Sequence, residues 1–281
     1  IARSVAATVG SEYGIIARRL TAESRTKSPA DLNTYEAMLL YLSYQIAPSP
    51  AASERCFAAL QAAVERDPDY GPVWSALGSL YCQMYVWDVP GFDDPLAVGR
   101  DYAERGVALE PDRQGSRLIR AYAMLLDDDL AAFHEEAEAT LALNPTSPYV
   151  TGTIGFLAVH AGDFQRGRTL LDRAMASNPI YPQWFRHGIY LERFQAGDFE
   201  GALKAVRGHD EAGFWYLALM AAALGKLGRI EEAQPWLTKL LAEKPDLPAR
   251  AEELISRTIK VKELVGEIVD GLVQAGMTRA G

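Results

Sequence analysis

Residues 148–181 read PYVTGTIGFLAVHAGDFQRGRTLLDRAMASNPIY, and this stretch decides the fold. A largely apolar run precedes the turn GDF at 162–164, a run with Gly167, Leu171 and Ala174 follows it, and small residues recur in both. Glycine at Gly155 and Gly167 allows two helices to approach closely, while bulky neighbours fill the space beside them. The stretch ends at Asn178-Pro179, because proline disfavours the α conformation in the residue before it. It therefore predicts one antiparallel helix pair.

The same ending recurs along the chain. A helix-like phrase closes on proline at Pro68, Pro111, Pro145, Pro179 and Pro245. The separations are 43, 34, 34 and 66 residues, which fit a 34-residue period with an insertion at 86–94 in the first interval. A fixed period of this length indicates an array of helical repeats. We expect repeats at about 31–68, 69–111, 112–145, 146–179, 180–212 and 213–245.

The two ends of the chain differ from the repeats. Residues 246–281 predict two capping helices, the second at 261–275 with an apolar stripe, because a stack of repeats needs a terminal helix with one polar face. Residues 1–30 predict a helix and a linker, which we interpret as the tail of an upstream domain. The expected organisation is thus 1–30, the repeat array at 31–245, and the cap at 246–281.

A first-helix signature supports the repeat assignment. Trp74, Leu77, Gly78 and Tyr81 form the pattern W-x-x-L-G-x-x-Y, and the windows at 148–181 and 217–245 fit the same template. Over about 31–245 the chain resembles tetratricopeptide-repeat (TPR) proteins. The resemblance implies an all-α fold: a right-handed superhelical solenoid of about six TPR-like helix pairs with a C-terminal helical cap.

The ends carry a narrower resemblance. IARSVAATVGSEYGIIARR at 1–19, PADLNTYEAMLLYLSY at 29–44 and IVDGLVQAGM at 268–277 resemble the TPR region of bacterial TolB-like, class III adenylate cyclase or winged-helix regulator proteins. This resemblance implies a cytoplasmic regulatory module of a larger bacterial signalling protein, with the cyclase or DNA-binding domain upstream of Ile1.

Composition excludes several classes of function. Lys+Arg 28 against Asp+Glu 37 gives a net charge of −9, so this region is not expected to bind the phosphate backbone of nucleic acids. The longest apolar run, at 214–225, is shorter than the roughly 20 residues of a membrane span. Cys56 and Cys82 are too few for a disulfide framework, which favours a reducing, cytoplasmic setting.

Catalytic and metal motifs are not found in the sequence. The four histidines, His134, His160, His187 and His209, have no second histidine or cysteine at metal-ligand spacing. Asp127, Asp128 and Asp129 lack the alternation of a calcium loop and predict a solvated turn instead. We therefore expect no enzyme in this segment, no metal and no cofactor.

The first helices of TPR-like pairs line a concave groove. The template register places the following candidates for ligand contacts there: Ser79, Gln83, Tyr149, Phe156, His160, Phe185, Ile189 and Arg193. Phe156 and Phe185 on neighbouring helices either form an apolar floor for a partner or pack against other helices, and both alternatives stay open.

Two further features have open alternatives. Arg113, Arg117 and Arg120 share one helix face, where they either contact a carboxylate of a partner or pair internally with Asp112 or with Asp127, Asp128 and Asp129. The inserted stretch at 85–95, YVWDVPGFDDP, either covers the mouth of the groove or shields the neighbouring helix pair through Trp87.

These observations predict a non-catalytic scaffold that binds a protein or peptide segment, which can be another domain of the same chain. Two alternatives remain: a homo-oligomerisation module that uses outer faces or the cap helix, and a small-molecule sensor with its ligand in the groove.

Overall fold

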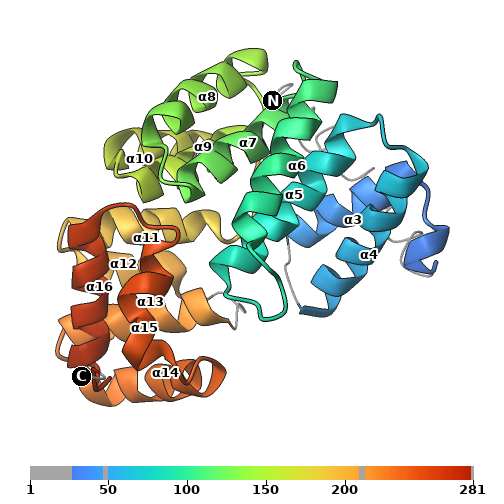
Figure 1. Ribbon diagram of the computed structural model, residues 1–281. Coiled ribbons are helices and arrows are strands. Elements are labelled where there is room, and N and C mark those ends of the chain that lie inside the picture. Colours follow the sequence, from blue (N-terminus) through green and yellow to red (C-terminus); the bar gives the residue numbers. More distant parts are fainter. Residues whose placement is uncertain (1–26, 47–49, 209–212, 280–281) are drawn as a thin grey trace. The chain divides into compact units, whose positions relative to one another are not determined.

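The computed structural model describes residues 27–46, 50–208 and 213–279, and the regular elements within them are all helical. The predicted all-α helical solenoid is confirmed. Figure 1 shows that consecutive helices form neighbouring antiparallel pairs. The helix expected within 1–30 lies mostly outside the described residues.

Six helix pairs follow one another in the described part of the chain. The first helices are α3 Thr34–Ile46, α5 Gly71–Val86, α7 Gln114–Leu126, α9 Pro148–Ala161, α11 Phe185–Gln195 and α13 Phe214–Lys226. The second helices are α4 Pro50–Arg66, α6 Pro95–Leu109, α8 Leu130–Leu143, α10 Phe164–Ser177, α12 Phe199–Val206 and α14 Ile230–Glu243. A short 3-10 helix, η1 Pro29–Asp31, precedes the pairs, and α15 Leu247–Ser256 and α16 Lys262–Gln274 follow them.

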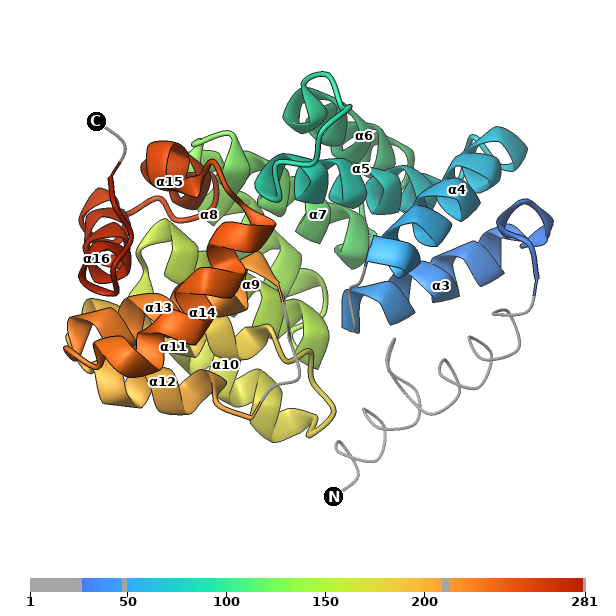
Figure 2. The same cartoon turned by 90° about the horizontal axis from the view of Figure 1, so that it is seen from below.

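The chain divides into two compact units. Of the described residues, the first unit holds 27–85 with a gap at 47–49, 89–154 and 170–182; the second holds 86–88, 155–169 and 183–279 with a gap at 209–212. In the first unit α3 packs on α4, as Figure 2 also shows, and α7 packs on α6 and α8. In the second unit α13 packs on α12, α14 and α16.

The closing prolines end the second helices as the sequence predicts. In five pairs the helix stops two residues before the proline: α4 before Pro68, α6 before Pro111, α8 before Pro145, α10 before Pro179 and α14 before Pro245. The residue between the helix and the proline leaves the helical conformation, as at Glu110 and Lys244. Proline thus sets both the end of each pair and the start of the turn to the next.

The first helices end in a left-handed residue. This residue is Gly162, Gly197 or Gly228 in three pairs, and Asp88 or Asp128 in two others. In all five turns the next N–H donates to a carbonyl five residues back, the hydrogen bond of a Schellman cap. Glycine is the usual residue here because it lacks the Cβ that clashes at positive φ. The cluster Asp127, Asp128 and Asp129 is therefore an exposed interhelix turn, in which Asp129 caps α8.

Helix α13 is the centre of the second unit. Its residues from Tyr216 to Gly225 are buried, which accounts for the long apolar run in the sequence. The stripe of α16, made of Leu264, Val265, Ile268, Val269 and Leu272, is buried as well, and α16 packs on α13. The cap helix thus uses its apolar face inside the unit. None of the described helices has the length and hydropathy that a membrane crossing requires.

Candidate interaction site

The groove candidates of the first unit belong to a polar interior. Ser79 is only 2% exposed, so its side chain is not open to a partner, which corrects the expected groove position. Gln83 accepts a hydrogen bond from the Tyr44 hydroxyl at 2.6 Å and donates to Gln45 at 3.4 Å. Tyr149 is half-buried. Gln83 also donates to the Ser79 hydroxyl at 3.5 Å, so Ser79 and Gln83 are both engaged within the first unit.

An aromatic cluster of the second unit contains two of the predicted residues. The ring of Phe156 meets that of Trp184 edge to face, with centroids 4.9 Å apart, and lies 4.1 Å from the ring of His160. Trp184 in turn meets Phe185 edge to face at 4.6 Å. Phe156 and Trp184 are half-buried, whereas Phe185 is 1% exposed. The rings that a partner can reach are therefore Phe156 and Trp184.

The position of Phe185 corrects the sequence prediction. Phe185 and Phe156 either form an apolar floor or pack against other helices, and Phe185 follows the second alternative because it is a core residue of α11. Trp184, directly before α11, takes the expected place beside Phe156. The repeat template did not indicate Trp184, because this residue lies before the first turn of α11 and outside the helical positions that the template describes.

His160 is a core histidine. It is 4% exposed, and its Nδ1 lies 2.8 Å from the carbonyl oxygen of Phe156 in the preceding turn. Its own carbonyl accepts a hydrogen bond from the Lys260 N–H at 2.8 Å. Burial disfavours the charged ring and lowers the pKa of His160 to about 4. His160 therefore packs against the ring of Phe156 from inside the protein and is not available to a ligand.

Ile189 and Arg193 are half-buried on α11. The Arg193 guanidinium contacts Asp198 at 2.5 Å, and Asp198 caps α12 by accepting from the Gly201 N–H at 2.9 Å. The Gly201 N–H and then Arg193 lower the pKa of Asp198. Arg193 is thus engaged within its own helix pair, while Ile189 stays a candidate contact.

The arginine face of α7 pairs internally. Arg117 forms a two-pronged contact with Glu136 at 2.7 and 3.0 Å, and Arg120 reaches the same carboxylate at 2.6 Å. Arg113 pairs with Glu110 at 2.9 Å. Internal pairing was one of the two alternatives, but the partners are these glutamates. Glu136 lies in the middle of α8 and contacts Arg117 of α7.

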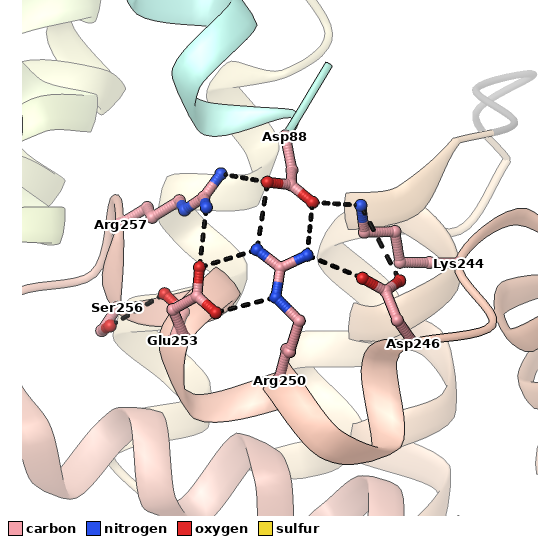
Figure 3. Close-up of polar contacts among 7 residues, drawn as sticks. All are labelled: Asp88, Lys244, Asp246, Arg250, Glu253, Ser256 and Arg257. Atoms are coloured by element: carbon pink, nitrogen blue, oxygen red, sulfur yellow. Dashed lines mark hydrogen bonds and ion pairs between the residues drawn. The ribbon is translucent and has the colours of Figure 1, made fainter. Parts of the chain in front are cut away.

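The inserted stretch at 85–95 has some residues in the first unit and others in the second. In the first unit, the ring of Phe92 packs edge to face on Phe57 and Tyr81. In the second unit, Asp88 enters a cluster of charged side chains, shown in Figure 3. Trp87 between α5 and Asp88 is 38% exposed and shields little.

The cluster around Asp88 joins three cations and three carboxylates. The Asp88 carboxylate accepts from Arg250 at 2.7 and 3.1 Å, from Arg257 at 2.9 Å and from the Lys244 ammonium group. The two remaining carboxylates are those of Asp246 and Glu253 (Figure 3). Arg250 above all, with Lys244 and Arg257, holds the pKa of Asp88 well below its usual range.

Metal ligands and thiols are the remaining reactive groups that the structure describes. The described residues contain no group of three or more His, Cys, Asp or Glu side chains that could hold a metal ion. Both cysteines are buried, and burial raises the pKa of Cys56 and brings that of Cys82 to about 12. Their thiols therefore stay protonated and unreactive near neutral pH.

Comparison with known proteins supports the fold. No protein-family model and no curated protein matches the chain. Among solved structures, it is similar to PilW, described as a widely conserved type IV pilus biogenesis factor, with 17% sequence identity and a TM-score of 0.50. The match covers 75% of this chain and 94% of PilW. At this identity the likeness concerns the fold alone, an array of antiparallel helix pairs.

Proposed function

We propose that this chain is a non-catalytic scaffold that binds a protein or peptide segment through Phe156 and Trp184 in its second unit. The observation that carries the proposal is the edge-to-face pair of these two half-buried rings, which the core residues His160 and Phe185 support. Aromatic side chains are enriched at protein interfaces, and tryptophan is among the residues that most often carry the binding energy.

The arrangement favours binding because the rings are already ordered. Each is held by a second aromatic group, so a partner does not bear the full entropic cost of immobilising them, about 0.5–1.5 kcal/mol for a flexible side chain. An aromatic pair also offers an apolar surface that needs no charged partner. The expected ligand is therefore a segment with an apolar side chain that covers both rings.

Selection of binding peptides tests the proposal. A displayed library of random peptides is selected on the whole chain, and the binders are then measured against Phe156→Ala and Phe156→Leu. We expect a loss of about tenfold or more in affinity for Phe156→Ala, as for an interface anchor, and an intermediate loss for the leucine variant. Ile230→Ala is the matched control, since Ile230 is 38% exposed on the second helix α14.

Binders that keep their affinity for Phe156→Ala would refute the proposal, provided that the circular dichroism and melting temperature of the variant match those of the wild type. Equal losses for Phe156→Ala and Ile230→Ala would refute it too, because they would point to general destabilisation.

The resemblance at the ends supports a more specific role, as the regulatory part of a larger cytoplasmic signalling protein of bacteria. In that role the bound segment belongs to another domain of the same chain. Sequencing the complete reading frame tests this idea, and a frame without a cyclase or winged-helix domain would refute it.

A further inference from the structure

Three basic residues, Lys244, Arg250 and Arg257, surround the Asp88 carboxylate and are called the receptor below. Three cations converge on this carboxylate, and Arg250 grips both of its oxygens with a parallel pair of N–H groups. Such two-pronged contacts are the strongest and most selective way in which a protein recognises a carboxylate. The Asp88 side chain is 21% exposed, so the receptor lies at the surface.

The receptor residues also contact two carboxylates of their own segment. Glu253 accepts from Arg250 at 2.8 Å twice and from Arg257 at 2.7 Å. Asp246 accepts from Arg250 at 2.6 Å and lies 3.8 Å from the Lys244 ammonium group. All five residues come from the continuous segment 244–257. Without Asp88, this segment would hold three positive and two negative charges, already oriented toward one empty carboxylate position.

The backbone at Asp88 has the left-handed conformation of other interhelix turns. Asp88 is the left-handed residue of the cap that ends α5, with φ of 53°, where Gly162, Gly197 and Gly228 serve in other pairs. A side chain at this backbone position costs free energy, although less for aspartate than for most residues. Asp128 takes the same position in another turn, so the cap accepts aspartate by itself; what distinguishes Asp88 is that three basic side chains contact its carboxylate.

We infer that Lys244, Arg250 and Arg257 form a binding site for an acidic peptide segment, and that Asp88 occupies this site as an internal ligand. The peptide presents one carboxylate flanked by apolar residues, as Asp88 is flanked by Trp87 and Val89. The site uses other residues than Phe156 and Trp184, so it does not rest on the function proposed above.

Competition from Asp88 regulates the site. Because Asp88 is joined to the site by a short connection, it competes at an effective concentration on the order of millimolar. A free peptide displaces it only at a higher concentration or with a higher affinity. Weak acidic segments are therefore excluded, and only a partner with further contacts displaces Asp88. The exposed Trp87 beside the carboxylate offers such a contact.

Emptying the site tests the inference on the whole chain. Asp88→Gly removes the carboxylate, and it places at the left-handed turn the residue, glycine, that three other pairs have there. The probe is a fluorescent peptide with the sequence of residues 85–92, YVWDVPGF, blocked at both ends so that aspartate provides its only carboxylate. A second probe, YVWNVPGF, differs only in that group. Fluorescence anisotropy measures both.

We expect Asp88→Gly to bind the aspartate probe about tenfold or more tightly than the wild type does, and to prefer it over the asparagine probe by a similar factor. Adding Arg250→Gln should abolish that preference. Asp128→Gly, which changes the equivalent turn of another pair, should bind like the wild type. Asp88→Asn provides a second test if the glycine variant does not fold.

Equal affinity of the two probes for the folded Asp88 variants would overturn the inference, as would equal affinity of these variants and the wild type for the aspartate probe. Persistence of the preference after Arg250→Gln would also overturn it, because the two-pronged contact would then not be the recognition element.

Discussion

Replacing Gly271 by alanine should destabilise the second unit, because α13 and α16 touch through their backbones at this residue. A Cβ at Gly271 would lie 2.5 Å from the carbonyl oxygen of Ala222, well inside the normal contact distance. The atoms in the way belong to the backbone of α13, so no side chain can turn aside. The two helices must separate, and the buried contacts of α16 weaken.

Gly266 in the same helix provides the control. A Cβ there meets nothing within 4 Å. Alanine is a better helix former than glycine by about 1 kcal/mol, so Gly266→Ala should stabilise the protein by up to that amount. Gly271→Ala gains the same helix propensity, but it loses favourable packing between α13 and α16. The difference between the two variants therefore isolates the steric cost, about 1–3 kcal/mol for an overpacked site and toward the upper end here.

Urea unfolding followed by circular dichroism measures this difference, and hydrogen exchange locates it. We expect faster exchange in α13 and α16 for Gly271→Ala. If the stabilities of the two variants agree within about 0.5 kcal/mol, the close approach of the helices is not as described.

Three further predictions concern buried groups. As pH falls from about 6.5 toward about 4, His160 is protonated in the unfolded chain before it is protonated in the folded chain, so the free energy of unfolding should fall by about 3 kcal/mol. In His160→Gln the urea midpoint should therefore depend less on pH between pH 5 and pH 6.5. A pH dependence equal to that of the wild type would contradict this origin. Glu136→Gln should cost about 1.5–3 kcal/mol in urea unfolding, because Arg117 loses its charged partner, whereas the exposed Glu135→Gln should change little. Cys56 and Cys82 should react with a thiol reagent only after denaturant is added, and rapid labelling of the native chain would show that they are accessible.

The repeat pattern accounts for most of the fold. The 34-residue spacing, the glycines and the closing prolines act within a few residues of themselves, so helix starts and ends follow from local backbone preferences. The cap stripe of α16 was predictable for the same reason. The candidate site was only partly predictable: Phe156 is among the predicted groove residues and is half-buried, but Phe185 is a core residue and Trp184 was not predicted, because exposure depends on how α11 packs on its neighbours.

Sequence alone thus determined what each segment becomes: an array of helix pairs, their turns and a capped end. Tertiary structure decided which charges meet. Glu136 pairs with Arg117 because α7 and α8 present these faces to each other, and Asp88 meets Arg250 across 162 positions of sequence. A local pattern sets backbone conformation through steric preferences within one turn. A contact between distant side chains depends instead on helix packing and the rotation of each helix about its axis, which no short stretch encodes.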